Sequence, residues 1–88
     1  MTTSELSRDE VLEKVRGHLS TELEVPISEI SEATSFRDDL DADSLDLYEL
    51  VMELEDTYGI RVSEEEASRI ETVGQAVDFV ADRLGVAT

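Results

Sequence analysis

Ser44 is the residue whose type and position could support chemistry, and it lies in DADSLDLYELVMELED, residues 41–56. A nucleophilic serine needs a general base, but the only histidine, His18, lies N-terminal to Pro26 with no paired acid motif. The G-x-S-x-G elbow of serine hydrolases is also missing from the sequence. We therefore predict no catalytic residue. Ser44 and the neighbouring aspartates could instead cap a helix, because Ser and Asp are favoured at helix N-termini.

Three aspartates around this serine have the spacing at which a calcium-binding loop begins. Asp39, Asp41 and Asp43 match the first, third and fifth positions of an EF-hand loop. The sixth position requires glycine and is Ser44, and the twelfth requires a bidentate glutamate and is Leu50. We predict no specific metal site, only weak attraction of divalent ions to the carboxylates.

The charge of the chain favours basic protein surfaces as partners. Its 88 residues include 23 acids and 7 bases, which gives a net charge of −16. Residues 38–60 contain nine of the acids and no lysine or arginine. Nucleic acids and anionic membranes would repel this surface, and no apolar run approaches the roughly 20 residues that span a bilayer. We predict no nucleic-acid binding and no stable membrane insertion.

Helix start and stop signals predict an all-α four-helix bundle with three longer helices and one short helix. Ser7, Ser63 and Thr72 each begin a capping box, with Glu or Gln three residues later. Pro26 ends the first helix, and glycines end the second and the last. The predicted helices begin near residues 7, 43, 63 and 72, and the first, second and last end before 26, around 58–59 and at 85.

A single domain over residues 1–88 is expected, because the chain is too short to bury two cores. The long connection before residue 41 should be a packed loop held by its own apolar residues, with Ile27, Ile30, Phe36 and Leu40 as candidates. Residues 1–8 lack a basic and apolar leader, and cysteine is absent. We expect a cytoplasmic monomer.

The predicted helix over residues 43–58 has two apolar stripes. The core-facing stripe comprises Leu47, Leu50, Val51, Leu54 and Tyr58. Leu45, Tyr48 and Met52 form a second stripe edged by acids, whose burial without partners would be costly. We therefore expect this stripe to be exposed and to bind a basic partner, with the flexible Met52 adapting to it. The expected partner-binding residues are Asp43, Leu45, Asp46, Tyr48, Glu49, Met52, Glu55 and Asp56.

The chain resembles the acyl carrier proteins of dissociated (type II) bacterial fatty acid synthesis, in which an Asp-Ser-Leu triplet opens an acidic second helix. The resemblance is carried by FRDDLDADSLDLYELVMELEDTYGIRVSEEEASRIETVGQAVDFV, and its most specific part is Asp43-Ser44-Leu45 followed by ELVMELED. It implies a non-catalytic four-helix carrier with 4′-phosphopantetheine on Ser44, transferred from coenzyme A by a separate transferase. It also implies acyl chains held as thioesters, and basic surfaces of the transferase and of fatty acid synthesis enzymes as partners.

One residue departs from the family pattern, which usually reads Asp-Leu-Gly-Ala-Asp-Ser-Leu. Asp41 stands where glycine is expected, although aspartate tolerates a left-handed backbone better than most residues. Three alternatives remain open at this point. Polyketide carriers share the fold and the serine, and peptidyl or D-alanyl carriers share the modification. An acidic helical adaptor would instead use the second stripe of the helix over 43–58 without a prosthetic group.

Overall fold

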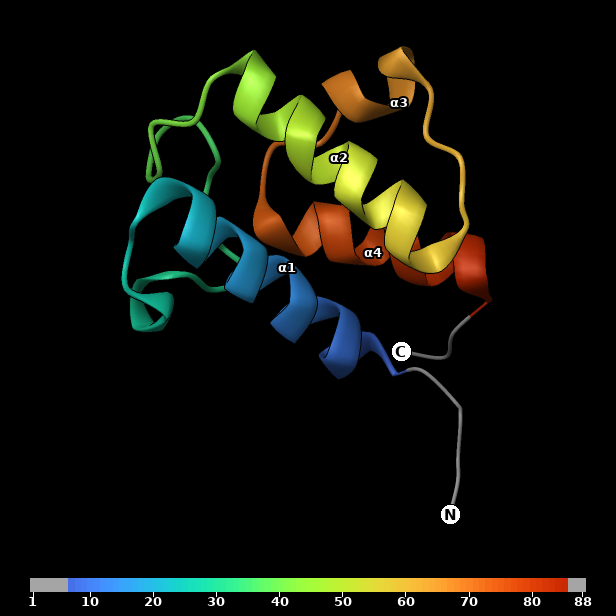
Figure 1. Cartoon of the computed structure of the whole chain (residues 1–88), viewed down its shortest axis with the longest axis horizontal. Coiled ribbons are helices and arrows are strands. Elements are labelled where there is room, and N and C mark those ends of the chain that lie inside the picture. The colour runs from blue at the N-terminus through green and yellow to red at the C-terminus, as the bar shows by residue number, and fades with distance from the viewer. Residues whose placement is uncertain (1–6, 86–88) are drawn as a thin grey trace.

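The computed structural model describes residues 7–85, and within this range the chain forms four α-helices and one short 3-10 helix (Figure 1). The helices are α1 (Arg8–Leu23), α2 (Ser44–Tyr58), α3 (Glu64–Ser68) and α4 (Val73–Leu84), and the 3-10 helix η1 spans Ile27–Glu29. The predicted all-α bundle of three longer helices and one short helix is confirmed. The expected ends of the domain, residues 1–6 and 86–88, lie outside the described residues.

Each of the four α-helices in residues 7–85 begins with a capping box. The three boxes predicted at Ser7, Ser63 and Thr72 are confirmed. The fourth was not predicted as a box, because aspartate replaces the usual Glu or Gln in the third helical position. There Asp43 and Asp46 each accept a hydrogen bond from the other's backbone N–H, at 3.2 Å from the Asp43 nitrogen and 3.0 Å from the Asp46 nitrogen.

The core lies between α1 and α4, and α2 covers one side of it (Figure 1). The inner face of α4 is buried, except that Leu84 at its end is half-buried. None of the helices in residues 7–85 has the length and apolar character needed to cross a membrane. The buried residues that these three helices contribute include Val11, Val15, Leu19, Leu50, Leu54, Val73, Ala76, Val77 and Val80.

The connection between α1 and α2 is a packed loop, as predicted, but one of its four expected anchors is wrong. Ile30 and Phe36 are buried and Leu40 is half-buried, whereas the side chain of Ile27 is 41% exposed. Ile27 begins η1 directly after Pro26, and its carbonyl makes the anchoring contact instead. The guanidinium of Arg16 donates hydrogen bonds to the carbonyls of Ile27 and Ile30, at 2.9 and 2.7 Å. The hydrogen bonds of Arg16 therefore hold the start of the loop, where apolar packing of Ile27 was expected.

The second half of this loop is fixed against the start of α4. Backbone hydrogen bonds of 2.9–3.0 Å run from the N–H groups of Val73 and Gly74 to the carbonyls of Thr34 and Glu32. Arg8 donates hydrogen bonds to the carboxylates of Glu32 and Asp78, at 2.6 and 2.8 Å. The bond to Glu32 lowers the pKa of that carboxyl group. The loop that leads into α2 is therefore anchored to both α1 and α4.

Two glycines in helices should respond in opposite ways to replacement by alanine. A Cβ on Gly74 would lie 3.0 Å from the backbone oxygen of Glu32, whereas a Cβ on Gly17 would meet nothing within 4 Å. Gly74→Ala should lower the free energy of unfolding by about 1–2 kcal/mol through overpacking, and Gly17→Ala should raise it by about 0.5–1 kcal/mol through helix propensity. Urea unfolding measures both changes. A stabilising Gly74→Ala would show that the loop does not press on α4.

Candidate functional site

Ser44 is the first residue of α2, and its side chain is exposed. The N-cap position belongs to Asp43, whose side chain accepts the hydrogen bond from the N–H of Asp46. Ser44 is therefore not needed as the cap, which was one of the functions its sequence position allowed. Its hydroxyl lies instead at the exposed, positive end of the helix dipole.

The turn before α2 depends on the unusual Asp41. This residue has φ of 55°, the left-handed conformation that the family meets with glycine, and it was expected to tolerate that conformation. The next residue, Ala42, is buried, and its N–H donates to the carbonyl of Phe36 at 2.8 Å. The left-handed residue thus turns the chain so that Ala42 enters the core and Asp43 can cap α2.

A pocket of about 840 Å³ opens beside Ser44. After α2 the chain turns back, so that α3 lies beside the N-terminal half of α2 and forms one wall of the pocket (Figure 1). Charged side chains from the loop before α2, from α3 and from Glu71 after α3 lie among the other residues that line it, and Arg37 is the one base among them. The apolar lining comprises Phe36, Ala42, Leu45, Leu47, Ala67 and Ile70. Sequence reasoning assigned no pocket to these residues, because they come from three separate segments.

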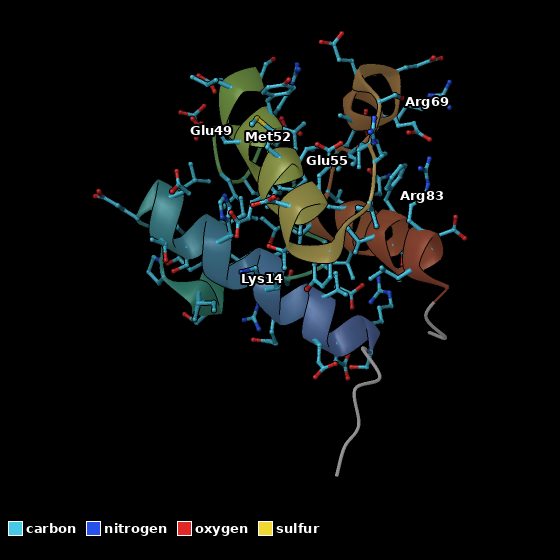
Figure 2. The ribbon with its side chains drawn as sticks, turned by 45° about the vertical axis from the view of Figure 1, so that its right-hand side comes forward. Lys14, Glu49, Met52, Glu55, Arg69 and Arg83 are labelled. Carbon is cyan, nitrogen blue, oxygen red and sulfur yellow. The ribbon has the colours of Figure 1, made fainter. Side chains whose placement is uncertain are left out.

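The outer face of α2 carries the expected apolar stripe. Leu45, Tyr48 and Met52 are 62%, 50% and 51% exposed, so the predicted exposure of this stripe is confirmed. Glu49 lies next to Met52 on the outer side of the helix (Figure 2). On the inner face Leu50, Val51 and Leu54 are buried as predicted, while Leu47 and Tyr58 are half-buried.

The acids of α2 do not all face solvent in the same way. Glu49 and Asp56 are exposed, whereas Glu55 is half-buried and accepts a hydrogen bond from the N–H of Val62 at 2.7 Å. Glu55 was predicted to bind a partner, and this contact gives it a local role in holding the segment after α2. Glu53 faces α1, where the ammonium of Lys14 lies 3.4 Å from its carboxylate and lowers its pKa.

The residues weighed for catalysis or metal binding are not assembled into a site. His18 lies on α1 and does not line the pocket beside Ser44. Within residues 7–85 no three His, Asp or Glu side chains converge to hold a metal ion. The site is better suited to a covalently attached group than to a metal ion. The exposed hydroxyl of Ser44 lies at the edge of a pocket with an apolar lining.

Comparisons with known proteins agree on one family. Residues 13–80 match the family described as "Phosphopantetheine attachment site". The chain is 47% identical over 77 residues to the acyl carrier protein of Rubrobacter xylanophilus, covering 88% of this chain and 95% of that protein. It is 39% identical over 80 residues to the acyl carrier protein of Lactobacillus acidophilus, covering 91% and 100%. A solved structure of the acyl carrier protein from Enterococcus faecalis superposes with a TM-score of 0.77 at 40% identity, covering 89% of this chain and 99% of that one.

Substitutions of Asp41 should follow backbone preference rather than charge. Because φ is 55° there, Asp41→Ala should lower the free energy of unfolding by about 1 kcal/mol, whereas Asp41→Gly should not lower it. Asp41→Asn removes the same charge but keeps a residue that tolerates this conformation, so it should remain close to the parent protein. Thermal unfolding of the three variants tests this. Equal stability of the Ala and Gly variants would contradict the left-handed turn.

Proposed function

The chain belongs to the acyl carrier protein family, whose members carry a covalently attached 4′-phosphopantetheine, and from this premise we propose that Ser44 is the attachment residue. Proteins of this family are non-catalytic carriers that a separate transferase modifies. They interact with fatty acid synthesis enzymes and with acyl chains. When attached, the arm supplies a thiol that holds acyl groups as thioesters.

The observation that carries this proposal is that Asp43 and Ser44, adjacent at the start of α2, have different roles. Asp43 caps the helix, which leaves the exposed Ser44 hydroxyl available to a transferase. A phosphodiester on Ser44 would meet the positive end of the helix dipole, which favours anions. The negative charges of the Asp43 and Asp46 carboxylates repel the phosphodiester and partly offset this effect. A serine on a rigid helix end fixes the origin of the arm while its far end moves freely.

The pocket beside Ser44 supports a second part of the proposal, that this chain shelters the acyl group. Phe36 and Ile70 are buried where they line it, and Leu47 and Ala67 are half-buried. Apolar surface of this kind favours an alkyl chain by about 25 cal/mol per Å² removed from water. Tethering then replaces a diffusive encounter at each step by a high effective concentration of acyl group.

We propose the outer face of α2 as the surface that delivers the acyl group to enzymes of dissociated fatty acid synthesis. Leu45, Tyr48 and Met52 supply exposed apolar contact area, and Glu49 and Asp56 supply exposed negative charge beside it. Opposite charge on the partner speeds encounter and fixes its orientation. A basic surface on the transferase and on the synthesis enzymes fits this face. We propose that the chain acts as a cytoplasmic monomer, whose one copy of this face binds one partner at a time.

Attachment at Ser44 can be tested on the intact protein. The purified chain is incubated with coenzyme A, magnesium and a promiscuous phosphopantetheinyl transferase, and its mass is measured. We expect one phosphopantetheine increment in the parent protein and none in Ser44→Ala. The reason is that Ser44 is the serine whose exposed hydroxyl lies at the N-terminal end of α2.

Ser68→Ala is the matched control, since Ser68 is also exposed and lines the same pocket. It should gain the same increment as the parent protein. Absence of the increment in the parent protein, or its persistence in Ser44→Ala, would overturn the assignment.

The acidic face of α2 should make loading dependent on salt. Screening of exposed charges beyond roughly 8 Å at physiological ionic strength should raise the KM of the transferase as sodium chloride increases. Glu49→Gln should reduce the slope of log KM against log salt, because Glu49 is exposed beside Met52. Glu22→Gln removes the same charge from α1 and should leave the slope unchanged. A KM that is constant with salt would refute electrostatic docking.

A further inference from the structure

The position of α3 needs an explanation, because this helix cannot hold itself in place. It has five residues, fewer than an isolated helix needs to be stable, and none of them is fully buried. It nevertheless supplies one wall of the pocket beside Ser44 through Glu64, Ala67 and Ser68. The shape of that pocket therefore depends on contacts that α3 makes with the rest of the chain.

One side chain from α4 makes such contacts on both sides of the start of α3. The guanidinium of Arg83 donates to the carbonyl of Arg61, before α3, at 2.8 Å, and pairs with the carboxylate of Glu66 within α3. It also lies over the ring of Phe79, with 4.6 Å between the guanidinium carbon and the ring centroid. Stacking on a residue one turn earlier in its own helix restricts the conformations of Arg83. The side chain is thus directed toward α3.

Glu66 extends this contact into the backbone of α3. One of its carboxylate oxygens accepts the N–H of Ser63 at 3.0 Å, and the other pairs with Arg83. The hydrogen bonds with Ser63 and the charges of Arg83 and Arg69 lower the pKa of Glu66. Within residues 7–85 this is the one ion pair that joins α3 to α4, and both side chains are about one-third exposed, at 36% and 31%. We call Arg83 and Glu66 together the α3–α4 clamp.

We propose that Arg83 is a positioning residue that sets the width of the acyl pocket by holding α3 against the body of the bundle. Arg83 does not line the pocket, so it acts through α3 and the segment before it. With the clamp closed, Ala67 and Ser68 stand opposite the N-terminal half of α2 and cover the acyl chain. With the clamp open, α3 is held by fewer contacts and the cover loosens. This inference rests on the proposed carrier function, but its first test does not need the arm.

Arg69 provides a matched control on the same side of the molecule (Figure 2). It carries the same charge and pairs with Glu65 at 3.0 Å, but that pair spans one helical turn and does not join α3 to another helix. The side chains of Arg69 and Glu65 are both about three-quarters exposed, at 74% and 77%. An exposed pair within one turn contributes little to tertiary structure. Loss of Arg69 therefore removes a charge without opening the clamp.

The first test is amide hydrogen exchange on the full chain without the arm, followed by NMR. The reporters are the amides of Ala67 and Ile70, which donate to the carbonyls of Ser63 and Ala67. Arg83→Gln should speed their exchange roughly fivefold, the scale set by losing one partly exposed ion pair. Exchange in the core of α1, at Val15 for example, should remain unchanged.

Two further variants make this result specific. Glu66→Gln keeps a residue suited to the capping box but removes the charge, so it should reproduce Arg83→Gln and serves if Arg83→Gln fails to fold. Arg69→Gln should leave the reporter amides unchanged. Unchanged exchange in Glu66→Gln and Arg83→Gln, equal acceleration in Arg69→Gln, or equal acceleration throughout the protein would each overturn the clamp.

The second test measures how well the acyl group is covered. The octanoyl-loaded protein is treated with hydroxylamine, and loss of the thioester is followed by mass. Arg83→Gln and Glu66→Gln should lose the octanoyl group faster than the parent protein, while Arg69→Gln should not. Faster α3 exchange with an unchanged cleavage rate would refute the link between clamp and pocket. If the chain takes up no arm at all, the proposed function fails, whereas the exchange result still decides the clamp.

Discussion

The fold depends on how α2, a helix with no base of its own, is held against the rest of a strongly acidic chain. Its inner face is held by apolar packing of Leu50, Val51 and Leu54, with help from the ion pair between Lys14 and Glu53. Burial of this face fixes the rotation of the helix. The same rotation turns the second apolar stripe to solvent and brings the N-terminal end of α2 to the edge of the pocket. The buried face of α2 therefore stabilises the fold, and the exposed face is the one that we propose binds partners.

The scarce bases are used mainly at junctions between elements. Arg8 joins α1 to the long loop and to α4, Arg16 joins α1 to η1 and the residue after it, and Arg83 joins α4 to α3. In a chain with 23 acids and 7 bases, a carboxylate partner is available almost anywhere, so the placement of each base decides which segments are joined. The long loop receives two of these arginines and a run of backbone bonds, while α3 depends on one. This difference is the basis for our proposal that Arg83 sets the position of the α3 wall of the pocket.

The sequence was sufficient for most features determined by neighbouring residues, although the box of Asp43 and Asp46 was missed because aspartate replaces the usual Glu or Gln. The boxes at Ser7, Ser63 and Thr72, the end of α2 at Gly59 and the two faces of α2 all follow from residues a few positions apart. Ile27 was misplaced because its surroundings depend on an arginine in α1. The pocket beside Ser44 was missed because separate segments of the chain form it. The contact of Glu55 with Val62 is closer in sequence, but it depends on the turn after α2, which brings Val62 back to the helix.

The most direct measurement is kcat/KM for loading of Leu45→Ser by a phosphopantetheinyl transferase, taken together with the melting temperature. Leu45 follows Ser44 and is 62% exposed, so its truncation should leave the melting temperature unchanged. If the outer face of α2 presents Ser44 to its partner, kcat/KM should fall by about tenfold, as for loss of one apolar anchor in an interface. An unchanged kcat/KM, or a fall only in step with lost stability, would contradict the assignment of separate roles to the two faces of α2.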